Sequence, residues 1–214
     1  MPQTLTQTLI FFYRLDCIIV LIMTISYYKS LREDYKPKPL ELKAVFIAES
    51  PPSSGRYFYD PEGSPTGEVL FRELLIESLG LRFGLKKEGL EAFRDKGFLL
   101  VDGTYQRINK NKNGNDIPSK QRDVIPLILI KTTVLNALAK PLHRNGFNIV
   151  NYNKAKNSYD PVFFPGRKTK YFRAQLRPML ESIGMAPPIE LVEKARIPLS
   201  KRRTAKTGGD KIDW

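Results

Sequence analysis

The sequence predicts an α/β domain, a three-layer α/β/α sandwich with a central four-stranded parallel sheet. One pattern in the sequence predicts it. Short apolar runs typical of buried strands alternate along the chain with amphipathic stretches typical of helices. Strands that alternate with helices form a parallel sheet whose faces the helices cover. The chain has 214 residues, 42% of them hydrophobic, which is enough for one good-sized domain.

The first half of this domain is expected to hold two strands and two helices. Lys43–Ala48 is short, apolar and rich in β-branched and aromatic residues, and predicts the first strand. Valine and leucines at helical spacing predict a helix over Glu68–Leu81, with Thr66 as its N-cap. A shorter helix is predicted over Lys86–Lys96. The continuous apolar run Phe98–Asp102 then predicts a second buried strand.

The second half repeats the alternation. Pro126–Ile130 predicts the third strand, and Thr132–Arg144 predicts a helix with four apolar residues on one face. Phe147–Asn151 is expected to be the fourth strand. The last helix is predicted over Lys168–Ile183. Gly103–Arg122, between the two halves, is too polar to pack and is expected to form a mobile loop.

Three segments are expected: an N-terminal apolar segment and linker (1–41), the domain (42–188) and a basic, disordered tail (189–214). Charges interrupt the apolar run Leu9–Tyr28, and its longest uncharged piece is too short to span a bilayer. This run could be a peripheral anchor or a weak signal. The interpretation we favour is that translation starts at Met23, with residues 1–22 upstream of the protein.

Net charge and the number of cysteines limit which partners and cofactors the chain can have. The formal net charge of +13 favours a polyanion, and we expect DNA, with a nucleotide as the alternative. A single cysteine excludes an internal disulfide and a four-cysteine zinc or iron–sulfur site, and a single histidine excludes a two-histidine mechanism. We therefore expect no cofactor, no metal and no iron–sulfur cluster. The expected state is a cytoplasmic monomer, associated with the nucleoid if the chain repairs DNA.

The clearest candidate site follows the first strand. Glu49 and Ser50 end that strand and precede two prolines, and Arg56, Tyr57 and Phe58 lie in the loop beyond them. Ligands of open α/β sheets bind at the carboxyl ends of the strands. A carboxylate is the strong base of this loop, so Glu49 is the candidate for orienting or activating water. The alternative is a structural loop in which Glu49 accepts backbone hydrogen bonds and the aromatic residues are buried.

Polar residues also follow the other predicted strands. Asp102 and Lys131 end the second and third strands, and the segment after the fourth strand leads to Arg167, Lys168 and Lys170 at a helix start. A helix start supplies backbone N–H groups and a positive dipole end, which suit a phosphate. The alternatives are a capping role for Asp102 and a solvated helix face for the two lysines.

The order of these motifs resembles the uracil-DNA glycosylase superfamily over roughly residues 43–183. Ala48 to Pro52 is similar to that superfamily's first motif, and Leu99 to Asp102 resembles its Leu-Leu-Asn strand end. Val162 to Gly166 lies at the place of its His-Pro-Ser loop. The resemblance implies hydrolysis of the bond between a flipped base and its sugar, by Glu49 and Ser50.

The resemblance also implies binding roles. Phe58, or Tyr57, would stack on the base and Asp102 would contact its edge. The basic residues that would contact DNA are Arg56, Arg167, Lys168 and Lys170.

Three positions depart from the superfamily pattern. Ser50 stands in place of an Asp or Asn that acts on water, Phe164 in place of the histidine, and Asp102 in place of an amide. An ionised carboxylate only accepts hydrogen bonds, so it would repel the carbonyls of uracil and prefer an exocyclic amino group. Two alternatives to a glycosylase therefore stay open: a non-catalytic nucleic-acid or nucleotide binder of the same fold, and a small-molecule hydrolase.

Overall fold

The computed structural model describes residues 26–51, 55–103 and 124–198. Most of the predicted N-terminal apolar run, all but the first residue of the predicted mobile loop and most of the basic tail lie outside these residues. Residues 26–33 are helical. The elements that follow are η1 (Pro39–Glu41), β1 (Ala44–Ala48), α2 (Val69–Leu79), α3 (Lys86–Asp95), β2 (Phe98–Asp102), β3 (Leu127–Leu129), α4 (Thr132–Arg144), β4 (Tyr152–Asn153), β5 (Ser158–Tyr159), α5 (Pro165–Ser182) and α6 (Ile189–Arg196).

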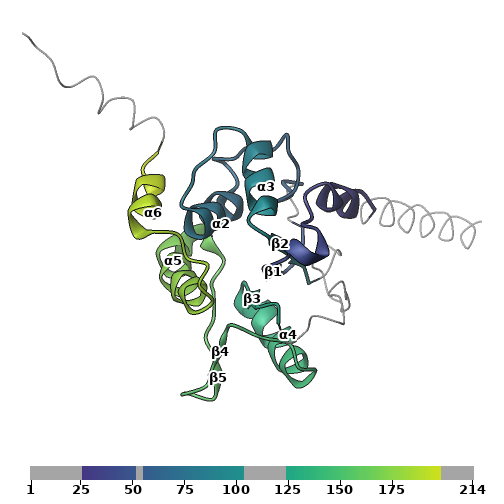
Figure 1. Ribbon diagram of the computed structural model, residues 1–214, viewed down its shortest axis with the longest axis vertical. Coiled ribbons are helices and arrows are strands. Elements are labelled where there is room, and N and C mark those ends of the chain that lie inside the picture. Colours follow the sequence, from purple (N-terminus) through teal and green to yellow (C-terminus); the bar gives the residue numbers. More distant parts are fainter. Residues whose placement is uncertain (1–25, 52–54, 104–123, 199–214) are drawn as a thin grey trace, which may run out of the picture.

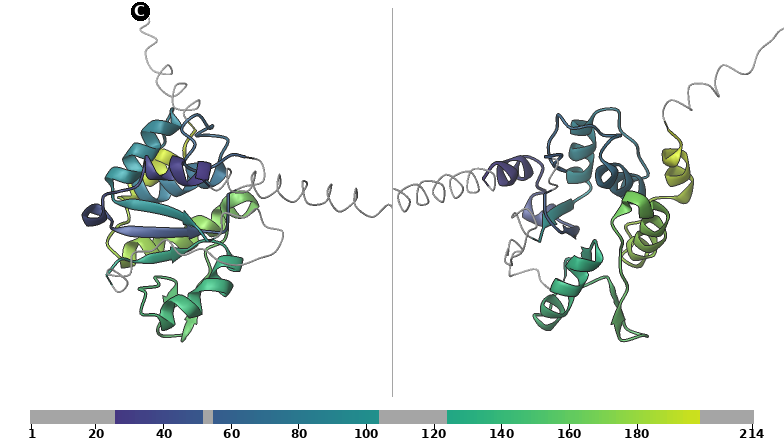
Figure 2. Two further views of the ribbon diagram at one scale, coloured as in Figure 1. Left: turned by 90° about the vertical axis from the view of Figure 1, so that its right-hand side faces the viewer. Right: turned by 180° about the vertical axis from the view of Figure 1, so that it is seen from behind.

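The central sheet has three parallel strands in the order β2-β1-β3 (Figure 1). Ala44 pairs with Phe98 at the start of β1 and β2, and Val45 pairs with Leu127 of β3. Every residue of β1 is buried, as the apolar run in the sequence predicted. Because the three strands run in one direction, their carboxyl ends meet at the same edge of the sheet, and helices α2 to α5 pack around it (Figure 2). The predicted α/β class with a parallel sheet is confirmed.

The fourth predicted strand differs from expectation. Phe147–Asn151 makes one isolated parallel bridge, between Ile149 and Leu127. Beyond it, the buried Asn151 side chain accepts a hydrogen bond from the Leu129 N–H (2.7 Å) and donates one to the Leu129 carbonyl (3.2 Å). A side chain thus replaces the main chain on the outer edge of β3, and among the described residues the sheet has three strands.

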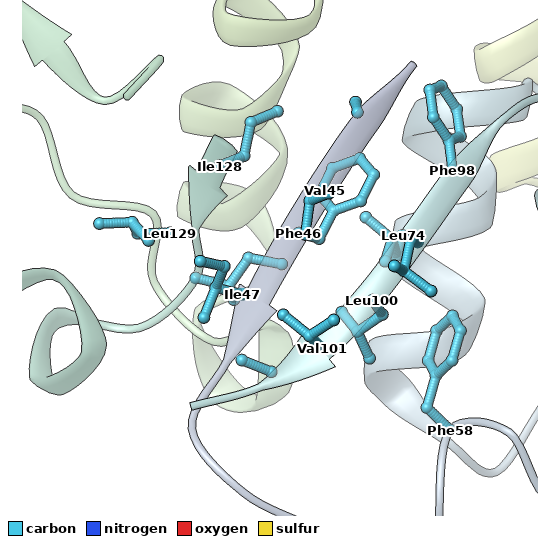
Figure 3. Close-up of a cluster of buried hydrophobic side chains, with 14 of the residues drawn as sticks. Val45, Phe46, Ile47, Phe58, Leu74, Phe98, Leu100, Val101, Ile128 and Leu129 are labelled. Carbon is cyan, nitrogen blue, oxygen red and sulfur yellow. The ribbon is translucent and has the colours of Figure 1, made fainter. Parts of the chain in front are cut away.

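Apolar side chains of the three strands form the core. Figure 3 shows Phe46 of β1, Phe98 of β2, Leu74 of α2 and Phe58 in one cluster of buried side chains. The Phe46 ring meets that of Phe98 edge to face at 5.6 Å between centroids, and Phe93 of α3 lies 5.8 Å away. This packing explains why α2 and α3 form where their apolar faces predicted them.

The folded unit extends beyond the predicted domain boundaries at both ends. Tyr28 and Arg32 of the first helix are buried, although they were expected to belong to the N-terminal apolar segment and linker. At the other end, α6 packs on α2 and buries Val192 against Ile76. The expectation of a disordered tail is therefore wrong for residues 189–196, whose apolar residues are too few to stand out in a basic segment.

Two helices also begin differently from the predictions. Thr66 does not cap α2, because the helix begins two residues later. The residue before it is Glu68, whose side chain pairs with Lys86 and makes no capping hydrogen bond. α5 begins at Pro165, before the predicted Lys168, and its first turn is irregular. Among the helices that the structure describes, none is long and apolar enough to cross a membrane.

Candidate functional site

Glu49 and Lys131 meet at the carboxyl edge of the sheet. Glu49 follows β1, and Lys131 stands between β3 and the first residue of α4. The Lys131 ammonium forms an ion pair with Glu49 Oε2, and the Thr133 hydroxyl donates a hydrogen bond to Glu49 Oε1 (2.8 Å). The side chains of Glu49 and Lys131 are 20% and 41% exposed, so solvent reaches both. This arrangement places a fixed carboxylate and a cation together at the predicted ligand edge, and we call these three residues the edge cluster.

Lys131 has a strained backbone. Its φ of 82° and ψ of 137° lie in a region that side chains other than glycine rarely adopt. The surrounding structure holds it there, because the Lys131 N–H donates to the Val162 carbonyl at 2.6 Å. Burial lowers the pKa of the Lys131 ammonium. Strained residues cluster at functional sites, and this one turns β3 sharply into α4 beside Glu49.

Asp102 ends β2, in register with Ala48, and is half-buried at the same edge of the sheet as Glu49. Burial raises the pKa of its carboxyl to about 7. The Tyr57 hydroxyl and the positive charge of Arg32 act in the opposite direction on this pKa and are weaker. The structure thus brings the Asp102 carboxyl near the Tyr57 hydroxyl and near Arg32 of the first helix. The role of Arg32 was missed because its segment was expected to be a linker.

Phe58 is a core residue in the structure. Its ring contacts Tyr59, Phe71 and Phe93, with centroids 5.0 to 5.5 Å apart. This is the arrangement expected for a loop that buries its aromatic residues. Stacking of Phe58 on a flipped base stays a prediction, and it would require the ring to leave this cluster.

A buried ion pair fixes the loop that carries Tyr57. The Lys86 ammonium donates to the Tyr57 carbonyl (2.5 Å) and to Glu68 Oε2 (2.7 Å). Burial raises the pKa of Glu68 and lowers that of Lys86. Gly63 closes over the pair, since a Cβ there would lie 2.2 Å from Glu68 Oε1. Nothing in the sequence marked this pair, because a lysine at the start of an amphipathic helix is usually solvated.

The predicted DNA-binding residues are exposed. Arg56 lies in the loop before Tyr57, and Arg167, Lys168 and Lys170 lie in the first turns of α5. The backbone of α5 departs from helical geometry at Gly166 and Lys168, so its first N–H groups are not aligned as a phosphate site at a helix start requires. The basic side chains can therefore contact phosphates, although the backbone N–H groups at the start of α5 do not form a regular phosphate site.

Ser50 is half-buried beside Glu49. In the part of the chain that the structure describes, no group of three or more His, Cys, Asp or Glu side chains is placed to hold a metal ion. Comparisons of the chain with protein-family models, curated proteins and solved structures give no match. Evidence about function therefore comes from the edge cluster and the residues around it.

Proposed function

We propose that the protein is a DNA N-glycosylase that hydrolyses the bond between a flipped, damaged or modified base and its deoxyribose. The observation that carries the proposal is Glu49, held by Lys131 and Thr133 at the carboxyl edge of the sheet in a chain of net charge +13. The motif order that resembles the uracil-DNA glycosylase superfamily supports it. The proposal includes a three-layer, four-stranded domain in which the segment around Ile149 is a fourth strand reduced to one bridge.

The edge cluster suits this chemistry. In the proposed reaction the bond from C1′ to the base nitrogen breaks, and a water oxygen forms the new bond to C1′. The Glu49 carboxylate orients this water, accepts its proton and stabilises the positive charge that develops on the sugar. The base leaves with its electron pair, and the Lys131 ammonium stabilises that negative charge. Lys131 would thus supply the cation that Phe164 cannot supply in place of a histidine.

Asp102 would contribute to base recognition. With its pKa raised to about 7, the carboxyl is partly protonated at neutral pH. A protonated carboxyl donates one hydrogen bond and still accepts others, so it can contact a carbonyl as well as an amino group. A base that carries a carbonyl is therefore compatible with this residue. The exposed Arg56, Arg167 and Lys170 would contact phosphates.

A non-catalytic nucleic-acid binder is the second candidate. It is favoured by the burial of Phe58 among three rings and by the position of Tyr57 near Asp102, because these contacts occupy the groups expected to hold a base. Such a protein would keep the basic surface and the fold but would not release bases.

The test is base release from single- and double-stranded oligonucleotides carrying uracil, hypoxanthine, xanthine and other altered bases, under single-turnover conditions. Glu49→Gln is expected to lower the rate by about 100-fold or more, because a general base contributes on the order of 10²–10⁴. Glu41→Gln is the matched control, since Glu41 is an exposed acid at the other end of the sheet and should leave the rate unchanged. Salt-sensitive binding without release of any base would favour the binder. Release that does not depend on Glu49 would exclude the edge cluster as the active site.

A further inference from the structure

We infer that the surface formed by Phe163, Phe164, Lys168 and Tyr171 binds single-stranded DNA by stacking on unpaired bases. We call these four residues the aromatic platform. The choice of DNA as the partner rests on the proposed function. The platform itself rests on the separate observations that follow.

Exposed aromatic rings are concentrated at this place. Phe164 and Tyr171 are 45% and 62% exposed. In the described residues, Tyr27 is the one other Phe, Tyr or Trp among the strongly exposed large hydrophobic side chains. Two exposed rings at the start of one helix, Phe164 just before it and Tyr171 within it, present apolar surface, and such grouping marks an interaction surface.

Charge and ring geometry at the platform fit a nucleic-acid strand. The rings of Phe163 and Tyr171 meet edge to face, with centroids 6.2 Å apart. The Lys168 ammonium lies 4.2 Å from the centroid of the Phe163 ring. Arg167 and Lys170 are exposed in the same turns. Aromatic faces that stack on bases, interleaved with cations that follow the backbone, are how proteins bind single strands without sequence preference.

Hydrogen bonds hold the platform in place. The Phe163 N–H donates to Gln175 Oε1 at 3.0 Å. The Thr169 hydroxyl lies 3.0 Å from the carbonyl oxygens of both Pro165 and Gly166, and donates to them. These bonds stabilise the irregular first turn of α5, so little side-chain and loop ordering is left to occur on binding.

The platform adjoins the edge cluster. Val162, whose carbonyl accepts a hydrogen bond from the Lys131 N–H (2.6 Å), immediately precedes Phe163. A strand that stacks on the platform would therefore run beside Glu49 and Lys131. Within a duplex, the stacked neighbouring base pairs hide the faces of each base, whereas an unpaired strand can present them, so the platform distinguishes the two forms.

The test measures binding of a fluorescent 15-nucleotide single strand, and of the matching blunt duplex, to the full-length protein at several salt concentrations. We expect the single strand to bind at least 10-fold more tightly. Tyr171→Ala and Phe164→Ala should each weaken single-strand binding by about 5- to 100-fold and change duplex binding less than twofold. Tyr27→Ala is the control, since this tyrosine is similarly exposed but lies outside the platform. Circular dichroism melting would verify that each variant folds.

Equal affinity for the two forms, or single-strand binding unchanged in both platform variants, would overturn the inference. The outcome is separable from that of the proposed function. Single-strand binding that depends on Tyr171 supports the platform even if no base is released. Base release that depends on Glu49 but not on Tyr171 or Phe164, with equal affinity for both forms, supports the glycosylase and removes the platform.

Discussion

Lys131 joins backbone strain to side-chain chemistry. Its φ of 82° is maintained by the hydrogen bond to Val162, and its ammonium contacts Glu49. A position that only glycine adopts without strain is occupied here by a lysine. A turn with no chemical role would gain stability from glycine, so the lysine at this position supports a functional role for its charge.

This strain can be measured with two substitutions at one position. Lys131→Gly and Lys131→Ala both remove the ion pair with Glu49, but only glycine relieves the strain. We expect Lys131→Gly to be more stable than Lys131→Ala by about 1 kcal/mol or more, measured by chemical denaturation. At Asn136, exposed within α4, the same two replacements should show the opposite order, because glycine destabilises a helix by about 1 kcal/mol relative to alanine. If alanine is more stable than glycine at both positions, the conclusion that the Lys131 backbone is strained would be contradicted.

Asp102 makes stability depend on pH. Its pKa is about 7 in the folded protein and about 3.9 in the unfolded chain, so the folded state binds the proton more tightly. This contribution to the free energy of unfolding is full below about pH 4 and is lost as the pH rises to about 7. Asp102→Asn removes it. Relative to this variant, the wild type should therefore lose stability between pH 4 and 7 and show a constant difference above pH 8. A difference that does not vary with pH would contradict the raised pKa.

At the scale of elements, the edge of β3 shows how one side chain can stand in for a strand. Asn151 hydrogen-bonds both backbone groups of Leu129 and also donates to the Asp160 carbonyl (3.0 Å). The segment Phe147–Asn151 was predicted to be a strand, but it pairs with β3 through a single bridge, because a run of apolar residues does not show how many main-chain pairs form. The pairing depends on where the segment turns away, and Asn151 makes that turn possible.

Asn151→Ala is expected to lower the free energy of unfolding by about 2 kcal/mol or more. The substitution leaves the buried N–H and C=O of Leu129 without their partners, and an unsatisfied buried group costs about 1–3 kcal/mol. Asn148→Ala, an exposed position in the same segment, is the control and should cost less than about 0.5 kcal/mol. Equal effects in urea denaturation would show that the side chain does not hold this edge.

At the scale of the whole molecule, buried charges join distant parts of the chain. Glu77 of α2 is fully buried and accepts hydrogen bonds from Arg196 of α6 at 2.9 to 3.1 Å, while Arg173 of α5 lies 3.7 Å away. Burial raises the pKa of Glu77, so for this carboxyl desolvation outweighs its arginine partners. The network therefore fixes how α6 docks and adds little net stability.

Arg196→Gln should destabilise the protein by about 2 kcal/mol, because it leaves the buried Glu77 carboxylate with Arg173, 3.7 Å away, as its cationic partner. Breaking a fully buried pair costs about 3–5 kcal/mol, and the expected loss is smaller here because Arg196 is partly exposed. Adding Glu77→Gln should restore most of the loss, since the double variant buries no charge. Arg94→Gln, which removes an exposed pair with Asp95, should change stability by less than about 1 kcal/mol. A double variant no more stable than the single one would contradict this account.

The sequence by itself determined the α/β class, the parallel strands and the placement of Glu49 at their carboxyl edge. Hydrophobic periodicity carries this information, because burial of one face of a helix or both faces of a strand constrains residues close together in the chain. Only the tertiary structure decided that Lys131 and Thr133 hold Glu49, that Asp102 faces Tyr57 and Arg32, and that Phe58 lies in the core. It also decided that α6 belongs to the folded unit. These outcomes depend on contacts between residues far apart in sequence, and on the desolvation of charged groups, which no local pattern contains.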